Sequence, residues 1–347
     1  MAPRQLMPRR CLRSPRSGRR AHRKRYSDLV LSLETMVAEG LFICPRCTGP
    51  VQRADGSWRC SNASCRYAAE PFPVVSGVPA LVDFDRSVLD ADKLRGSGGA
   101  SPIRRTRLHR VLNRLLHPAN TTAAASVARM LRLLGADDAA ARRRPRILVI
   151  GGGTRGDGLA ALYAEPAVDL IAFDIYFSPA VQFVGDGHAI PLTDGSVDGV
   201  VIQAVLQHML EPTVVVNEIH RVLRSGGIVY ADSPFLQQVC EGPYDFTRFT
   251  DSGHRYLFRS FECVDSGCVA GAGTALRWSL DYFVRALTRS VRLGRVTSLC
   301  LFWLSYADRM LDRGHSLDAA SSVFFLGRKS AAPITPTQII GYYQGRT

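Results

Sequence analysis

A glycine-rich turn between an apolar run and a helix-like segment constrains the fold of this chain most strongly. Residues 147–158 read Ile-Leu-Val-Ile-Gly-Gly-Gly-Thr-Arg-Gly-Asp-Gly, which places Gly151, Gly153 and Gly156 at the spacing G-x-G-x-x-G. Glycines at this spacing let the backbone turn tightly and approach a ligand at the start of a helix. Asp174 follows at the end of the next apolar run, where a carboxylate can bind both hydroxyls of a ribose. The pattern predicts a ribose-containing cofactor and leaves open which group follows the ribose.

Apolar runs and helical stretches alternate after this turn. We expect strands at 147–150, 169–173, 181–184, 197–202 and 227–231, and helices at 156–163 and 212–223. Such alternation indicates a parallel sheet with right-handed crossovers. Two later strands are expected at 261–264 and 322–326, with a helical insertion at 276–311 between them. The predicted fold class is therefore α/β, with a doubly wound, Rossmann-like sheet and a helical insertion before the last strand.

Four of the nine cysteines form a cluster near the beginning of the chain. Cys44 and Cys47 are two residues apart, and Cys60 and Cys65 form a second pair twelve residues later. Two such pairs can provide the closed tetrahedral shell of a structural Zn²⁺ site, although four unrelated buried cysteines are the alternative. The odd and uneven cysteine distribution does not indicate a disulfide framework, so we expect a reducing, cytoplasmic environment.

The net charge of +14 is concentrated at the N-terminus. Residues 1–26 contain ten Lys and Arg residues and no acid, which leaves 34 basic and 30 acidic side chains in the other 321 residues. The body of the protein is nearly neutral, so nucleic-acid binding is not predicted except through this tail. We expect the tail to be disordered, although its composition also fits an organelle transit peptide. No apolar stretch reaches the roughly 18 residues that a membrane span requires.

These features divide the chain into six parts. A basic tail (1–26) and a short helix (26–40, with Ser27 as its N-cap) precede a zinc module at 41–85. Residues 86–145 are expected to form a linker and helices at 104–116 and 123–134. The main domain is predicted at 146–330, followed by a C-terminal tail at 331–347.

The sequence after the glycine turn resembles class I S-adenosylmethionine-dependent methyltransferases of the type 11 kind. The resemblance lies in Gly-Asp-Gly-His-Ala-Ile-Pro-Leu-Thr-Asp-Gly-Ser-Val-Asp-Gly-Val at 185–200 and in Asn-Glu-Ile-His-Arg-Val-Leu-Arg-Ser-Gly-Gly at 217–227. It implies that S-adenosylmethionine binds with its ribose at Asp174, its adenine at Asp186 and Gly187, and its methionine end at Gln203. One departure is Val149, which stands where this family commonly has an acid.

The cysteine module and the loop after residue 232 extend the resemblance. Leu-Phe-Ile-Cys-Pro-Arg-Cys at 41–47 and Phe-Pro-Val-Val-Ser-Gly-Val-Pro at 72–79 are similar to zinc ribbons found beside some methyltransferases. The aromatic and charged loop at 233–258 resembles methyltransferases of bacterial glycan and polysaccharide gene neighbourhoods, which often have His where this chain has Cys240. Candidate catalytic or acceptor-binding residues near the carboxyl edge of the sheet are His208, Tyr244, Asp245, Arg248 and His254. A purely structural role remains an alternative for these residues.

The predicted function is methyl transfer to an oxygen or nitrogen atom of a small-molecule or glycan-type acceptor. The enzymatic alternative is a ribosomal RNA guanine methyltransferase, because one bacterial group of these also joins a zinc ribbon to this fold. Val149 keeps open a catalytically silent binding partner, and the glycine turn alone would also fit a nicotinamide-dependent oxidoreductase. The apolar insertion at 276–311 is expected to cap the pocket or to form a homodimer contact, with a membrane surface as a further alternative.

Overall fold

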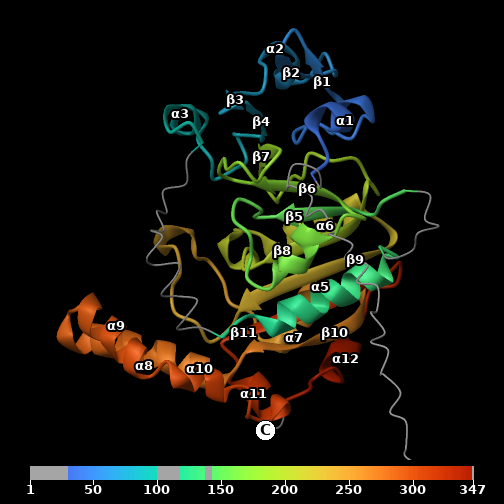
Figure 1. The fold of residues 1–347 in the computed structure, drawn as a ribbon. Coiled ribbons are helices and arrows are strands. Elements are labelled where there is room, and N and C mark those ends of the chain that lie inside the picture. Colours follow the sequence, from blue (N-terminus) through green and yellow to red (C-terminus); the bar gives the residue numbers. More distant parts are fainter. Residues whose placement is uncertain (1–29, 100–117, 137–142, 346–347) are drawn as a thin grey trace, which may run out of the picture.

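The computed structural model describes residues 30–99, 118–136 and 143–345. Its centre is a nine-stranded sheet with the order β10-β11-β9-β8-β5-β6-β7-β4-β3 (Figure 1). The strands are β3 (Val74–Val75), β4 (Val78–Leu81), β5 (Arg146–Ile150), β6 (Asp169–Asp174), β7 (Phe183–Gly185), β8 (Val197–Gln203), β9 (Leu223–Pro234), β10 (Phe261–Ala270) and β11 (Ser322–Lys329). All seven strands expected from the sequence are present, and β9 and β10 are longer than expected.

The central part of the sheet is parallel. Strands β4, β7, β6, β5, β8 and β9 pair in parallel, whereas β11 runs antiparallel between β9 and β10. This confirms the predicted doubly wound α/β class. The reversed β11 also distinguishes the sheet from the all-parallel order of the dinucleotide-binding fold.

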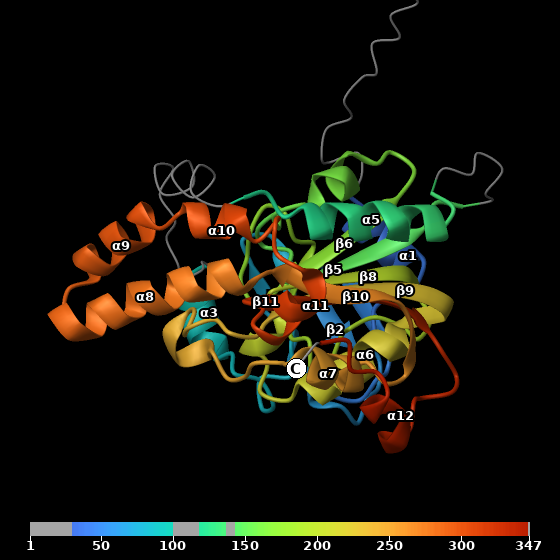
Figure 2. The same cartoon turned by 90° about the horizontal axis from the view of Figure 1, so that it is seen from below.

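Helices cover both faces of the sheet (Figure 2). Helix α5 (Thr121–Leu133) lies on one face, and α6 (Pro212–Val222) and α7 (Asp251–Leu257) lie on the other. The apolar residues of α5 and α6 recur at helical spacing, so each of these two helices buries one stripe against the sheet, whereas three of the four buried residues of α7 are polar or charged. In α6 that stripe consists of Val215, Val216, Ile219 and Val222.

Two helix predictions need correction. The segment after the glycine turn is a 3₁₀ helix, η2 (Leu159–Ala164), rather than an α-helix beginning at Gly156. Gly158 precedes it with a φ of +82°, and a Cβ at Gly158 would lie 2.4 Å from the carbonyl oxygen of Asn120, so the start of α5 crowds this turn.

Helix α1 (Leu33–Ala38) is capped by Ser32, whose side chain accepts from the Thr35 N–H, whereas the predicted cap Ser27 lies outside the described residues. The basic tail 1–26 and the helix expected at 104–116 also lie outside them.

The N-terminal module is joined to the main sheet rather than separate from it. It contains α1, the hairpin of β1 (Val51–Ala54) and β2 (Ser57–Cys60), α2 (Arg66–Ala69) and α3 (Ala91–Gly96). Strand β4 then pairs in parallel with β7 and extends the sheet. Phe42 reinforces this junction, because its ring lies 5.5 Å from the ring of Trp58 in the module and 5.5 Å from that of Phe183 in β7.

The insertion before β11 is helical, as expected. Helices α8 (Ala272–Thr288), α9 (Val291–Cys300) and α10 (Trp303–Ala307) project from one end of the sheet, followed by α11 (Arg313–Asp318) and, after β11, α12 (Pro336–Ile340) (Figures 1 and 2). Phe283 and Leu287 are largely exposed on this projection. Among the described residues, no helix is both long enough and apolar enough to cross a membrane.

We predict that the junction at Phe42 is important for stability. Phe42 is 1% exposed, so Phe42→Ala should lower the free energy of unfolding by about 3–5 kcal/mol through lost burial and an unfilled cavity. Urea denaturation measures this change. Val74→Ala is the control, because Val74 is 48% exposed and its replacement should change the free energy by less than about 0.5 kcal/mol. Equal effects of the two substitutions would contradict the assignment.

Candidate functional site

The glycine turn lies at the carboxyl edge of the sheet, directly after β5. Gly151 has a φ of +74°, a conformation that favours glycine. The N–H of Gly153 donates to Oδ2 of Asp174 at 2.9 Å, and a Cβ at Gly153 would lie only 2.6 Å from that oxygen. Gly156 is equally restricted, because its Cβ would overlap the side chain of Gln203. The structure therefore brings the three predicted glycines together with Asp174 and Gln203.

Asp174 ends β6 beside this turn. Burial raises the pKa of its carboxyl group, and hydrogen bonds from the backbone N–H groups of Gly153 and Tyr176 oppose that rise. The neighbouring Tyr176 is also desolvated, which raises the pKa of its phenol to about 12. These hydrogen bonds hold the Asp174 carboxylate in one orientation, and the residue lines the cleft.

Asp186 and Gly187 follow β7 on the same edge. The Asp186 carboxylate is 2.5 Å from Ser87 Oγ and 2.6 Å from His188 Nδ1. Burial alone would raise the pKa of Asp186, but hydrogen bonds from His188 and Ser87 outweigh burial and lower it. The linker residue Ser87 therefore helps to orient the carboxylate that was expected to face adenine. Ser87 carried no sequence signal for this contact.

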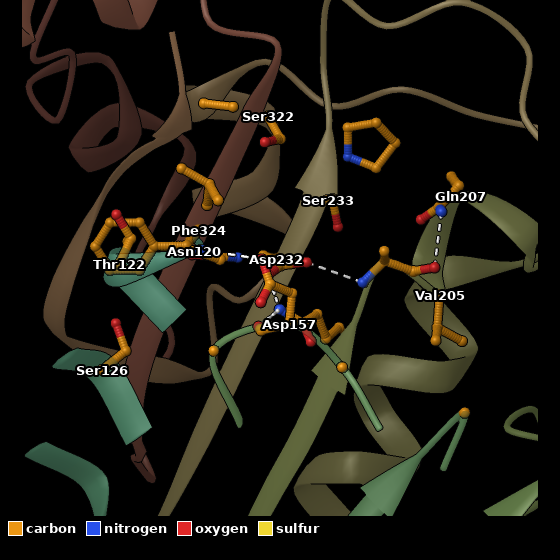
Figure 3. A pocket seen from close by; sticks show the side chains of 18 of the residues that line it. Asn120, Thr122, Ser126, Asp157, Val205, Gln207, Asp232, Ser233, Ser322 and Phe324 are labelled. Atoms are coloured by element: carbon orange, nitrogen blue, oxygen red, sulfur yellow. Dashed lines mark hydrogen bonds between the residues drawn. The ribbon is translucent and has the colours of Figure 1, made fainter. Parts of the chain in front are cut away.

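Gln203 and a second carboxylate, Asp232, lie where the methionine end of the cofactor was expected. Gln203 Nε2 donates to Asp232 Oδ2 and to the Asp157 carbonyl oxygen, both at 3.0 Å. Asp232 also accepts from the Ala204 N–H and points toward the cleft from β9 (Figure 3). Burial raises the pKa of Asp232 to about 6. Val149 is a buried core residue and is not among the residues that line the cleft, whereas Asp232 is.

His208 and Tyr244 also line the cleft and contact each other. His208 ends the 3₁₀ turn η3 (Leu206–His208), and Tyr244 ends the turn η4 (Gly242–Tyr244). His208 Nδ1 lies 2.6 Å from the Tyr244 carbonyl oxygen. A carbonyl can only accept a hydrogen bond, so Nδ1 carries the proton, and the lone pair of Nε2 accepts from Gln207 Nε2 at 3.0 Å.

Asp245 and Arg248 bind each other rather than the cleft. Their side chains form a bidentate ion pair, and Arg248 also donates to the carbonyl oxygens of Gln237 and Gln238. The Asp245 carboxylate accepts from the Cys240 N–H at 2.5 Å. Neither side chain is among those lining the cleft, so their predicted contact with the acceptor is corrected to a contact that holds the loop in place.

His254 is not available as a base. Its side chain is 1% exposed, and burial lowers its pKa to about 3. Nε2 lies 3.2 Å from Ser233 Oγ. The histidine is therefore a neutral core residue, and the residue that it contacts, Ser233, lines the cleft.

A single large cleft connects these groups. Its volume of about 3330 Å³ exceeds the roughly 300–1,000 Å³ of an ordinary small-ligand pocket, so it has room for a cofactor and an acceptor together. Its walls come from α5, the strand ends and β11, as the placement of Asn120, Asp232 and Phe324 illustrates (Figure 3). The described lining contains seven carboxylates (Asp157, Asp174, Asp186, Asp232, Glu241, Asp265 and Asp308) and four guanidinium groups (Arg129, Arg132, Arg155 and Arg309). This surplus of acid disfavours a polyanionic ligand.

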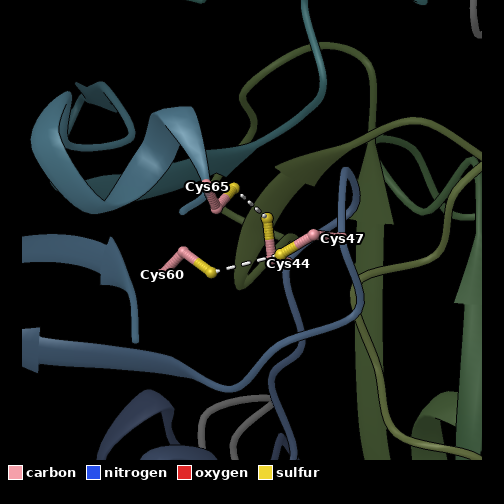
Figure 4. Close-up of side chains that lie close together, drawn as sticks. All are labelled: Cys44, Cys47, Cys60 and Cys65. Atoms are coloured by element: carbon pink, nitrogen blue, oxygen red, sulfur yellow. Dashed lines mark hydrogen bonds between the residues drawn. The ribbon is translucent and has the colours of Figure 1, made fainter. Parts of the chain in front are cut away.

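The four clustered cysteines converge in the N-terminal module (Figure 4). Sγ of Cys44 lies 3.8 Å from that of Cys65, and Sγ of Cys47 lies 3.4 Å from that of Cys60. These separations are too long for disulfides and close to the about 3.8 Å between sulfurs around a tetrahedral Zn²⁺. Burial raises the pKa of Cys44 and raises that of Cys60 to about 11, so a cation is needed to hold these sulfurs as thiolates. The donor set fits Zn²⁺.

Comparison with known proteins identifies one domain. Residues 156–231 match the family described as "Methyltransferase domain". An uncharacterized 37.1 kDa protein in transposon Tn4556 of Streptomyces fradiae is 44% identical over 57 residues, which are 16% of this chain and 16% of that protein.

Several solved structures share part of the fold at low identity. A SAM-dependent methyltransferase from Archaeoglobus fulgidus is 15% identical, with 64% of this chain and 99% of that chain covered and a TM-score of 0.39. The 1,6-didemethyltoxoflavin-N1-methyltransferase of Burkholderia thailandensis, solved with S-adenosylhomocysteine, is also 15% identical, with coverages of 61% and 79% and a TM-score of 0.37.

The domain match covers the end of the glycine turn and runs through β9, which is the part of the sheet that carries Asp174, Asp186 and Gln203. It agrees in position with the resemblance found in the sequence. This chain therefore contains a methyltransferase domain that includes residues 156–231.

Proposed function

We propose that this chain transfers a methyl group from S-adenosylmethionine to an oxygen or nitrogen atom of a small-molecule or glycan-type acceptor. The observation that carries the proposal is one cleft whose lining includes the glycine turn and Asp174 together with His208, Glu241 and Tyr244. Both a nucleoside-binding wall and a second, polar wall are needed for a transfer between two bound molecules.

The residues of the first wall fit the cofactor. Asp174 would accept hydrogen bonds from the ribose hydroxyls, and Asp186 with Gly187 would lie at the adenine. The glycine turn allows the backbone to approach, since side chains at Gly153 or Gly156 would collide with Asp174 or Gln203. When bound, the cofactor supplies a methyl group already activated by a positively charged sulfur.

The residues of the second wall would align the acceptor and exclude water. Tyr244 is partly exposed beside His208, and both line the cleft. His208 Nε2 carries no proton, so this side chain can contact an acceptor hydroxyl or amine as a hydrogen-bond acceptor in place of its contact with Gln207. Asp245 and Arg248 hold the backbone of this loop.

The charge of the cleft supports a small acceptor over RNA. Phosphate backbones are bound by clustered Lys and Arg residues, whereas carboxylates outnumber guanidinium groups in this lining. We therefore favour a neutral or cationic acceptor group, such as a sugar hydroxyl or an amine. The ribosomal RNA reading and the silent binding partner are outcomes of the tests below.

We also propose that Cys44, Cys47, Cys60 and Cys65 hold one structural Zn²⁺, and that the enzyme works in the cytoplasm. The exposed apolar residues of α8 and α9 support a homodimer contact through 276–311. We propose domain boundaries at 41–85 and 146–330. The two domains share one continuous sheet, because β4 of the first pairs with β7 of the second.

The first functional prediction concerns the cofactor. Asp174→Ala should weaken binding of S-adenosylhomocysteine by about 1.5–3 kcal/mol, or roughly 10- to 150-fold, because a charge-assisted hydrogen bond is lost. Calorimetry measures the affinity. Asp169→Ala is the matched control, since Asp169 begins the same strand at its opposite end and should bind as the unsubstituted chain does. Comparable or tighter binding of NAD or NADP would overturn the assignment.

The second prediction concerns zinc. Purified protein should retain about one tightly bound equivalent by elemental analysis, and Cys60→Ser should lose it and increase hydrogen exchange across 41–85. Cys300→Ser, on the exposed surface of α9, is the control and should retain the metal. Full retention in a chain lacking both Cys60 and Cys65 would show that the metal is held elsewhere.

The third prediction separates the acceptor classes. A shortened chain that begins at Tyr26 lacks the ten basic residues of the tail, so it should bind RNA weakly and lose that binding as salt rises. It should still transfer radiolabelled methyl groups to small-molecule extracts. Filter binding at two salt concentrations, beside the methyl-transfer assay, measures both properties. Tight binding and methylation of RNA by the shortened chain would establish the ribosomal RNA alternative, and no transfer to either substrate would favour a silent partner.

A further inference from the structure

Three metal-binding side chains of different types converge on the acceptor side of the cleft. One donor atom each of His208, Cys240 and Glu241 lies within 4.8 Å of the other two. His208 Nε2 is 3.9 Å from Glu241 Oε2. All three residues line the cleft that also contains the glycine turn. We propose that these residues form a second metal site, which binds Zn²⁺ or a similar divalent transition-metal ion and leaves one coordination position open to the acceptor.

The donor set indicates the class of metal. One imidazole nitrogen, one thiolate and one carboxylate suit borderline-soft ions such as Zn²⁺ and Co²⁺, whereas Mg²⁺ and Ca²⁺ prefer oxygen alone. Three protein ligands with an open fourth position are typical of catalytic zinc sites. A nitrogen and an oxygen bound to a tetrahedral Zn²⁺ are about 3.3 Å apart, so His208 Nε2 and Glu241 Oε2, now 3.9 Å apart, would move closer by about 0.6 Å on binding the metal.

The histidine is oriented as a ligand. Its Nδ1–H donates to the Tyr244 carbonyl oxygen at 2.6 Å, which leaves the Nε2 lone pair on the side of Glu241. A backbone carbonyl bound to the remote nitrogen is the usual support of a metal-binding histidine. In this structure Nε2 accepts from Gln207 Nε2 at 3.0 Å, and the same amide nitrogen donates to the Ala204 carbonyl oxygen at 2.8 Å. A metal ion would replace the first contact, and the second would keep Gln207 in place.

The loop that carries Cys240 and Glu241 is held in place by hydrogen bonds and an ion pair. The Asp245 carboxylate accepts from the Cys240 N–H and is bound in turn by Arg248. The N–H groups of Phe246 and Thr247 donate to the Gln207 carbonyl oxygen, so the loop is tied to the turn that carries His208. The charged pair Asp245 and Arg248 therefore lies outside the cleft lining but holds the loop whose residues Cys240, Glu241 and Tyr244 line the cleft.

A metal ion at this site would activate the acceptor for methylation. This role rests on the proposed methyl transfer. An acceptor hydroxyl that occupies the open position would be polarised by the cation, which lowers the pKa of the hydroxyl and lets its proton leave to water. The resulting oxygen would be a better nucleophile at neutral pH. The surplus of carboxylates in the cleft would also favour a cation there.

Cobalt titration of the protein tests the site. The full-length protein, with its tightly held zinc equivalent in place, is titrated with Co²⁺ while the absorption of thiolate-to-cobalt charge transfer is recorded. We expect one additional equivalent with the spectrum of a single thiolate. Cys240→Ser should abolish the charge-transfer band, and Glu241→Gln should weaken Co²⁺ binding at least about 10-fold. Cys300→Ser is the matched control and should titrate as the unsubstituted chain does.

Zinc content and S-adenosylhomocysteine affinity are measured on the same samples. Unchanged values in Cys240→Ser show that the chain is folded and that the four-cysteine site is intact, so the lost band belongs to the second site. Should that variant fail to fold, the loss of Co²⁺ affinity in Glu241→Gln decides the question. The site is refuted if the unsubstituted chain shows no single-thiolate band, or if Cys240→Ser retains it. A metal site in a chain that does not bind S-adenosylhomocysteine would instead refute the proposed function.

Discussion

The parallel pairing of β5 with β6 and β8 determines where the glycine turn, Asp174 and Gln203 lie. Parallel strands in register end at the same edge, so Asp174 at the end of β6 and Gln203 at the end of β8 meet beside the turn after β5. The turn can lie this close only because its glycines lack side chains. Both faces of these strands are buried by helices, which makes the edge rigid enough to position polar groups at hydrogen-bond distance.

The N-terminal module depends on the same sheet. Because β4 pairs with β7, the module stands next to the strand that delivers Asp186, and the segment leaving it places Ser87 on that carboxylate. The module also covers an edge strand that would otherwise expose unpaired backbone groups.

Local patterns in the sequence were sufficient to predict the strands, the glycine turn, Asp174 and the four-cysteine cluster. Each of these depends on spacing within a short segment. The pairing of β4 with β7 was not predictable, because β4 is four residues long and its partner lies about a hundred residues away. Asp232 was missed because it ends an apolar run without any motif, although a lone carboxylate between Ala231 and Ser233 at a strand end was an available signal.

In the loop that contains Asp245 and Arg248, residue type alone does not predict which side chains line the cleft. Asp245 and Arg248 are residue types that often bind ligands, but they stand three positions apart in the sequence and their side chains neutralise each other. Only the backbone path of the loop decides whether such groups face each other or the cleft. The same path brings Cys240 and Glu241 to His208, a convergence that no spacing in the sequence indicated.

A crystal structure of the protein with S-adenosylhomocysteine tests the central claim most directly. The account predicts that the ribose oxygens lie within hydrogen-bond distance of Asp174, that the adenine lies beside Asp186 and Gly187, and that the sulfur faces the His208 side of the cleft. Density for the ligand elsewhere on the molecule, or a ribose that does not contact Asp174, would contradict it.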